Sequence, residues 1–281
     1  MSKLLCGLRR LRREHPAILI GGTLLSVMFM LAAFAPYLGT VDPTSVAPAK
    51  RNLTPSTVAW FGTDSVGRDI YSRTLYGARV SLAIGISVAS IAAIGGLAVG
   101  LVAGFMRRLD GIIMRVVDGI MAIPPILLAI ALMALTRSSI WNVIAAISLA
   151  EIPRMARLVR GVVLSLRDQN FVEAAITVGT PTPTIIFKHI LPNTMSTLMV
   201  QATYVCASAM ISESILSFIG AGVPPNTPSW GNIIAEGRSL WQIFPHMIAI
   251  PAVFLSLTVL AVNMLGDGLR DANAPRRVTR T

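Results

Sequence analysis

Few side chains in this sequence could form a catalytic centre. Ser212, Glu213 and Ser214 are adjacent and offer two hydroxyls beside a carboxylate. A serine nucleophile also needs a base such as histidine, and no base accompanies this cluster in the sequence. The histidines lack metal-ligand spacing and are expected in different compartments: they are His15, His189 and His246. We therefore expect no catalytic residues.

The sequence also lacks the motifs that bind a metal ion or a nucleotide. The only cysteines are Cys6, in a basic terminus, and Cys206, in an apolar run, which gives neither a disulfide framework nor a metal-ligand spacing. No Gly-x-x-x-x-Gly-Lys-[Ser/Thr] phosphate loop occurs. We expect no metal site and no cofactor in this chain, so ATP and Mg²⁺, if used, are bound by another chain.

Two acidic residues in or near apolar segments have a cation close by in sequence. Asp118 is three residues from Arg115, and Glu151 is three from Arg154. Residues three apart are neighbours on a helix, so local pairing near the inner membrane surface is expected.

Glu213 has no such neighbour. A carboxylate in hydrocarbon is a functional candidate by default. It is predicted to contact solute or a partner helix, or else to form a hydrogen bond with a backbone group within the bundle. The same alternatives apply to Asn263.

The composition is that of a membrane protein. The chain has 281 residues, of which 54% are hydrophobic and only 13% charged, against roughly a quarter charged in soluble domains. The net charge of +11 comes from basic residues between apolar runs. A nucleic-acid-binding domain would cluster them on one soluble face with aromatics, so nucleic acid is not an expected partner.

Six segments approach the length of about 20 apolar residues that a membrane helix needs. The first is too long for a signal-peptide core, and Pro36 after its Ala-x-Ala pattern would hinder cleavage, so a retained helix is expected. The fourth is the shortest. The segments are 17–38, 80–106, 112–135, 139–153, 194–219 and 246–266.

The basic residues give an orientation. With six spans and a cytoplasmic start, 17 of the 24 Lys and Arg residues fall on the inner side, as the positive-inside rule requires. Both termini are then cytoplasmic. The outer side holds Lys50, Arg51, Arg68, Arg73, Arg79, Arg137 and Arg238.

Two of the expected spans contain small residues or prolines that affect helix packing or continuity. Gly96, Gly100 and Gly104 form a smooth stripe, which favours close helix packing within the chain or against a partner, with a pore-lining role as the alternative. Pro124 and Pro125 interrupt the third span, as a packing kink or a hinge.

Outside the spans, 154–193 is expected to form an inner segment with helical patterning, and 220–245 an outer segment of turns with a short surface helix. In the inner segment, Asp168 or Asn170 is expected to cap a short helix around 171–180. Glu173 suits the positive end of its dipole, and Gly179 ends it. Pro192 is predicted to set the boundary of the next helix.

This inner string resembles the EAA motif of permease subunits of binding-protein-dependent ABC importers. Its spacing matches throughout, and the one departure is His189, where many families carry isoleucine and the dipeptide and oligopeptide branch commonly carries histidine. The resemblance implies that this helix couples to an ATPase subunit. The matching residues are Glu173, Ala174, Ala175, Gly179, His189, Leu191 and Pro192.

The outer segment 39–79 has turn glycines, carboxylates able to pair with nearby arginines, and aromatics suited to a membrane interface. It resembles the signature of the C-type permeases of the dipeptide and oligopeptide importers, as do Pro228–Gly231 and the ending 265–272. Its signature residues are Gly62, Thr63, Asp64, Gly67, Arg68, Asp69 and Arg73.

The resemblance implies an all-α, polytopic protein with the type I importer permease fold in a bacterial inner membrane. Residues 1–79 would hold the amino terminus, the first helix and the outer segment. Residues 80–275 would form the core transmembrane domain with its coupling loop 154–193, and 276–281 a basic tail. The implied partners are a second, homologous permease, two ATPase subunits, a solute-binding protein outside the membrane, and lipid.

Peptide is the expected solute because it is commonest in this branch; glutathione, nickel and metal–chelator complexes are the alternatives. Two other classes of membrane protein fit the sequence less well. A secondary transporter would show internal repeats, which this sequence lacks, and a membrane protease would need the missing base.

Overall fold

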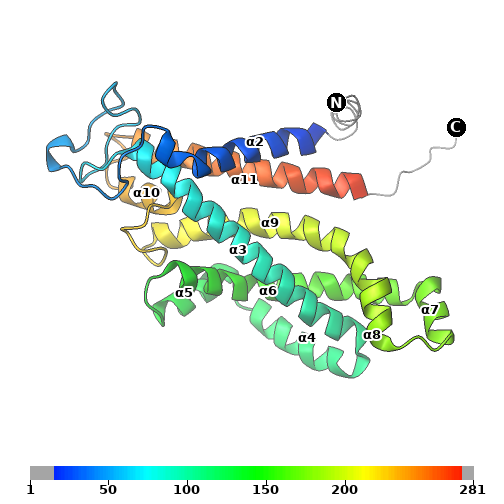
Figure 1. Cartoon of the computed structure of the whole chain (residues 1–281). Coiled ribbons are helices and arrows are strands. Elements are labelled where there is room, and N and C mark those ends of the chain that lie inside the picture. The colour runs from blue at the N-terminus through cyan, green and yellow to red at the C-terminus, as the bar shows by residue number, and fades with distance from the viewer. Residues whose placement is uncertain (1–15, 274–281) are drawn as a thin grey trace, which may run out of the picture.

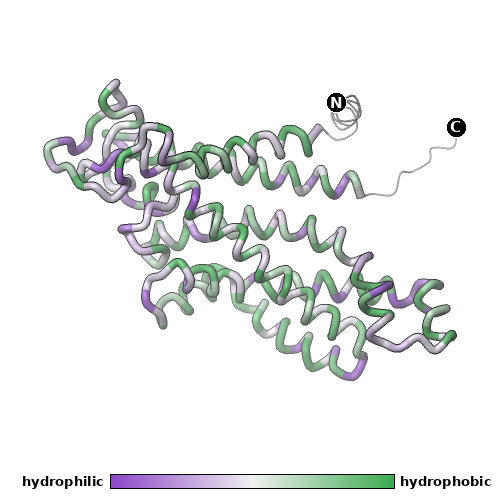
Figure 2. Tube along the Cα trace, in the orientation of Figure 1, coloured by the Kyte–Doolittle hydropathy of each residue, from purple (hydrophilic) through white to green (hydrophobic). Residues whose placement is uncertain are grey.

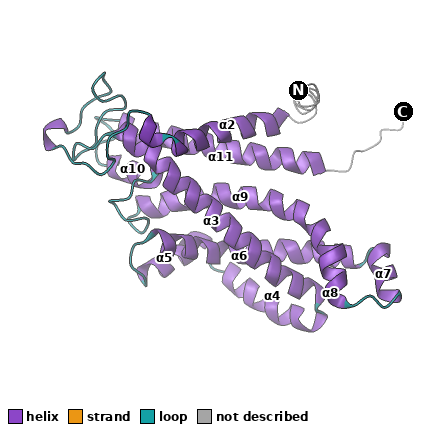
Figure 3. Cartoon of the chain, viewed as in Figure 1, coloured by secondary structure: helices purple, strands orange, loops and turns teal. Residues whose placement is uncertain are grey.

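The computed structural model describes residues 16–273 and is built almost wholly of helices (Figures 1 and 3). Within these residues the only β pairing is an isolated bridge between Thr63 and Asp69. The basic amino terminus, with Cys6 and His15, and the tail 276–281 lie outside the described residues. The helices are α2 (Pro16–Ala33), η1 (Ala35–Tyr37), η2 (Pro48–Lys50), α3 (Ile70–Phe105), α4 (Arg107–Met121), α5 (Pro125–Ala134), α6 (Ile140–Arg167), α7 (Asn170–Thr177), α8 (Thr182–Ile185), the π-helix η3 (Ile186–Ile190), α9 (Leu191–Phe218), α10 (Trp230–Gly237) and α11 (His246–Asn273).

The long helices form one bundle. Helix α3 packs against both α6 and α9, and α11 against both α2 and α9. The loop between α2 and α3 gathers with α10 at one end of the bundle, and α7 and α8 project at the other (Figure 1). Figure 2 shows hydrophobic residues along the bundle and hydrophilic ones concentrated at its ends. We name the end with α7, where the arginines of α6 gather, the inner end, and the end with α10 the outer end.

Within residues 16–273, four helices are long and apolar enough to cross a membrane: α2, α3, the continuous helix from Thr182 to Phe218, and α11. The bent pair of α4 and α5 makes a fifth if it counts as one span. Helix α6 is the sixth long element. It begins at Ile140 as expected but runs on to Arg167, and it is less apolar than the others because it carries four arginines and one glutamate.

The predicted third span is not one continuous helix. Helix α4 ends at Met121 and α5 begins at Pro125, with a bend of 81° between them. Pro124 has an extended backbone (φ −54°, ψ 132°), because a residue that precedes a proline is driven out of the helical region. The two prolines therefore separate two helices rather than kink one.

Helix α3 begins at Ile70, well before the expected start near residue 80. Its glycine stripe packs within the chain, against α6. A Cβ at Gly100 would lie 2.6 Å from Cβ of Val159, and one at Gly104 would lie 2.7 Å from Cβ of Val163. Only glycine allows the two backbones to approach this closely.

Pro192 lies in the first turn of α9, at the predicted helix boundary, but the helical structure is not interrupted there and runs from Thr182 to Phe218. Pro192 has no N–H to donate. The wider π-turn just before it keeps the helix continuous, with the N–H of Leu191 donating to the carbonyl of Ile186. The Asn193 side chain donates to the carbonyl of His189 at 2.6 Å.

Candidate functional site

The short helix α7 lies at the inner end between α6 and α8. It ends as predicted at Gly179, whose φ is +81°. The N–H of Thr180 donates to the carbonyl of Ala175 at 3.0 Å and that of Gly179 to Ile176 at 2.9 Å, which is the Schellman arrangement. Glu173 lies in the first turn. Neither expected cap is used, because Gln169 occupies the N-cap position without a side-chain bond.

One side chain anchors α7, and most of the others face outward. Val172 is fully buried, whereas Glu173, Ala174 and Gly179 are exposed and Ala175 is half-buried. Phe171 lies beside the His189 ring, 6.3 Å between centroids.

The surface around α7 is apolar. Val178 is 85% exposed and Phe187 is 67% exposed. Leu191 is half-buried and Pro192 exposed. Exposed apolar surface of this kind, outside the apolar bundle, is typical of a protein contact.

At the outer end, the signature residues form an ion-pair network. Asp64 accepts hydrogen bonds from Nε of Arg68 and Nη1 of Arg73, both at 2.6 Å. Glu236, on α10, pairs with both arginines, at 2.6 Å to Nη2 of Arg68. Arg73 is almost wholly buried. The predicted pairing of carboxylates with arginines is confirmed, but the part played by Glu236 was not predicted.

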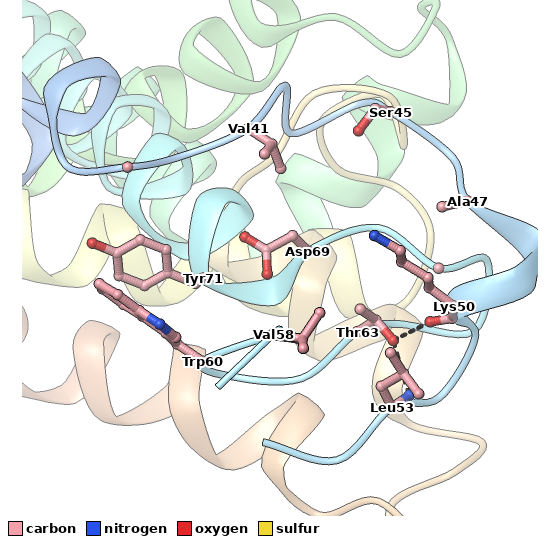
Figure 4. Close-up of a pocket in the computed structure, with 13 residues that line it drawn as sticks. Val41, Ser45, Ala47, Lys50, Leu53, Val58, Trp60, Thr63, Asp69 and Tyr71 are labelled. Atoms are coloured by element: carbon pink, nitrogen blue, oxygen red, sulfur yellow. Dashed lines mark hydrogen bonds between the residues drawn. The ribbon is translucent and has the colours of Figure 1, made fainter. Parts of the chain in front are cut away.

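The other signature residues shape the outer loop and a pocket of about 260 Å³ (Figure 4). Thr63 donates its hydroxyl to the carbonyl of Lys50 and accepts from the N–H of Leu53 at 2.9 Å. Asp69 caps α3 by accepting from the N–H of Ser72 at 2.8 Å. Gly67 has φ +85° and lies against the Ala47 carbonyl, where no side chain fits.

Gly62, with φ +79°, is also in the left-handed region. Elsewhere in this loop, the hydroxyl and the backbone N–H of Thr44 both donate to the Asp42 carboxylate. These bonds lower the pKa of that carboxyl below its usual value, and the bond from the hydroxyl has the larger effect.

The short helix expected in 220–245 exists as α10, but it is buried and not on the surface. Trp230 is fully buried, and its indole N–H donates to the carbonyl of Thr74 at 3.0 Å. Its backbone N–H donates to the Ser81 hydroxyl at 3.2 Å. Both partners belong to α3, so α10 is tied directly to the bundle.

Glu213 is enclosed by the protein. It is fully buried, and Oε1 accepts hydrogen bonds from the hydroxyls of Ser217 and Ser229, each at 2.8 Å. Oε2 has no partner among the described residues. Because Ser229 also caps α10, Glu213 links α9 to α10.

The other pathway candidates differ in place. Asn263 is half-buried with no side-chain hydrogen bond among the described residues, and Pro124 and Pro125 are exposed at the α4–α5 bend.

Glu151 pairs with Arg154 at 3.3 Å, as expected. The expected pairing of Asp118 with Arg115 is wrong: Asp118 pairs with Arg157 of α6 at 2.5 Å.

One face of α9 carries polar side chains that the sequence reasoning missed. Thr197, Gln201, Tyr204 and Ser208 recur at intervals of three and four residues, which places them on one helix face. The first three, with Arg270 of α11, line an open cavity of about 490 Å³. Their spacing was the signal that could have revealed them.

This polar face is connected to charged groups. The Tyr204 hydroxyl donates to Asp267 at 2.5 Å. Farther along the helix, Ser208 lies 3.5 Å from Oε1 of Glu151.

The family model of the "Binding-protein-dependent transport system inner membrane component" matches residues 96–279. The chain belongs to this family. Such a component is an inner-membrane protein, in agreement with the apolar helices of this permease.

Individual relatives agree with this membership. The permease is 51% identical over 271 residues to a Sinorhizobium fredii protein named "Probable peptide ABC transporter permease protein y4tQ", with 96% of this chain and 93% of the relative covered. It is 46% identical over 270 residues to the glutathione transport system permease protein GsiD of Salmonella typhimurium, covering 95% and 89%.

Solved structures share the fold. An inward-facing structure of the MetNI methionine ABC transporter superposes with a TM-score of 0.59 at 19% identity, covering 72% of this permease and 96% of that chain. The expected importer permease fold is therefore confirmed.

Proposed function

We propose that this permease is one of two unlike membrane subunits of an ATP-driven importer for peptides. The similarity to the Sinorhizobium fredii relative named for peptide transport supports peptide as the solute. The observation that carries the coupling part of the proposal is α7, a helix anchored by Val172, ended by Gly179 and otherwise exposed at the inner end.

In this proposal α7 docks into an ATPase subunit. Its exposed apolar neighbours, Val178 and Phe187, lose contact with water on docking, and that burial favours association. The Schellman motif fixes the path of the chain after α7. Movement of the ATPase therefore passes to the rest of the permease as a rigid-body shift.

The chemistry belongs to partner chains. Two ATPase subunits would bind ATP and Mg²⁺, and this permease would hold neither. A second, homologous permease would complete the translocation path, and a solute-binding protein would dock on the outer loop. The ion-pair network of Asp64, Arg68, Arg73 and Glu236 supports such docking, because it ties that loop to α10.

The polar face of α9 is the proposed wall of the path. A peptide carries an ammonium, a carboxylate and amide groups, which need polar partners inside a membrane. Gln201 and Tyr204 offer hydrogen bonds, and Arg270 offers a cation for the carboxylate. Glu213, being enclosed, is assigned to packing instead.

Glutathione is the second candidate solute, on the observation that GsiD is 46% identical over nearly the whole permease. Glutathione is itself a tripeptide with two free carboxylates, so the two candidates share their polar groups.

Copurification tests the proposal. The chain is expressed with its neighbouring genes, extracted in detergent, and its bound proteins are identified by mass spectrometry. We expect a second permease and ATPase subunits, and the ligand of the accompanying binding protein then separates peptides from glutathione. A stable complex that contains no ATPase would refute the proposal.

A further inference from the structure

Helix α4 turns its acidic side chains toward α6. Asp110 accepts a hydrogen bond from Nη2 of Arg160 at 2.7 Å, and Asp118 pairs with Arg157 at 2.5 Å. Both carboxylates of α4 are thus matched by cations of the neighbouring helix.

The arginines of α4 have no such partners. Arg107, Arg108 and Arg115 are exposed, and within residues 16–273 none of them forms an ion pair with a carboxylate. Arg108 and Arg115 are seven residues apart, so they lie on one helix face about 10 Å from each other along the axis. All three line an open hollow of about 540 Å³.

Apolar side chains share this face. Ile112 is 67% exposed and Val116 is 60% exposed, and both line the same hollow. A Cβ at Gly111 would touch nothing within 4 Å, so the floor of the hollow is open. The face therefore combines cations with apolar surface.

The depth of α4 follows from α3. Helix α3 has 36 residues and is about 54 Å long, longer than a hydrocarbon core of roughly 30 Å. It runs from the outer to the inner end, and α4 starts immediately after it. The first turns of α4 therefore lie near the inner membrane surface, the depth of the lipid headgroups.

We propose that this face of α4, Arg107, Arg108 and Arg115 with Ile112 and Val116, binds an anionic phospholipid of the inner leaflet. The arginine guanidinium groups match a phosphate in charge and geometry, and the two aliphatic side chains lie against an acyl chain. A protein partner would have to bring carboxylates to three cations at this depth, whereas phospholipid phosphates are already there.

Native mass spectrometry tests the proposal. The full-length chain, in the assembly in which it purifies, is titrated in detergent with dioleoylphosphatidylglycerol and separately with dioleoylphosphatidylcholine. The variant carries Arg108→Gln and Arg115→Gln, and the control carries Arg137→Gln, an exposed arginine in the loop between α5 and α6.

The wild type and the control are expected to bind phosphatidylglycerol more tightly than phosphatidylcholine. The double variant is expected to lose on the order of 20-fold in affinity for phosphatidylglycerol. Equal binding by variant and wild type would overturn the proposal. So would loss of a protein subunit from the variant with lipid binding retained, because the arginines would then serve a protein contact. Neither result would bear on the importer function.

Discussion

Arg73 in the first turn of α3 and Glu236 on α10 are 163 residues apart in sequence, yet Nη1 and Nη2 of Arg73 donate to the two carboxylate oxygens of Glu236. Arg73 is 1% exposed. The pair closes the outer end of the molecule by joining the outer loop, α3 and α10.

Breaking this pair should destabilise the outer end. Arg73→Met leaves Asp64 and Glu236 without their buried cation, and we expect a loss of about 3 kcal/mol in unfolding free energy. Thermal unfolding in detergent measures the effect. Arg51→Met, at an exposed position in the same loop, is the control and should change little. Equal midpoints for the two variants would show that the network does not stabilise the fold.

The packing of α3 on α6 gives a second prediction. Gly100→Val places a branched side chain against Val159 and the Ala156 carbonyl, and overpacking should cost about 1–3 kcal/mol. Gly161→Ala, at a helix position with nothing within 4 Å of the added Cβ, should be neutral or slightly stabilising. Unfolding midpoints of the two variants are compared, and a Gly100→Val protein as stable as the wild type would mean that the helices can separate there.

Glu213 should matter for stability and little for solute choice. Glu213→Gln keeps an oxygen acceptor for Ser217 and Ser229, so we expect a change below about 1 kcal/mol. Glu213→Ala leaves the hydroxyls of Ser217 and Ser229 without their acceptor and a cavity behind, and should cost about 2–4 kcal/mol. The measurement is the unfolding midpoint of each. A changed solute preference in a stable Glu213→Gln protein would instead place this carboxyl on the path.

The polar face of α9 should be accessible to water. With the native cysteines replaced, Gln201→Cys is expected to react with a water-soluble thiol reagent in intact membranes. Glu213→Cys, in the same helix but buried, should not react. Ile94→Cys, 71% exposed on the apolar bundle, should also be protected by lipid. Labelling is read by mass shift, and an unreactive Gln201→Cys would remove α9 from the proposed path.

Local patterns predicted much of this molecule. The apolar segments located the helices within a few residues where no proline or charge intervened, and the Glu173-to-Gly179 spacing predicted a helix that ends in a left-handed glycine. These features depend on neighbours in sequence, which a sequence displays directly.

The errors arose where distant segments meet. The sequence offers Asp118 a close cation in Arg115, but packing of α4 on α6 brings Arg157 instead. The ion pairs of Glu236 and the burial of α10 depend on contacts with α3, far away in sequence. Pro192 was expected to set a helix boundary, but the π-turn that joins α9 to the helix before it cannot be recognised from residue types alone. The polar face of α9 could have been predicted, because its polar residues recur every three or four positions, but it was not.

The coupling role of α7 is tested most directly by two matched glycines. Gly179 ends α7 and Gly220 ends α9, each with positive φ, +81° and +85°, and with the same pair of Schellman bonds. Alanine at either position carries the same backbone strain, about 1–2 kcal/mol, but only Gly179 lies at the inner end. The measurement is the amount of ATPase subunit that copurifies with each variant, relative to the amount of inserted permease. We predict that Gly179→Ala loses most of the bound ATPase while Gly220→Ala retains it; equal retention by both variants would contradict a coupling role for α7.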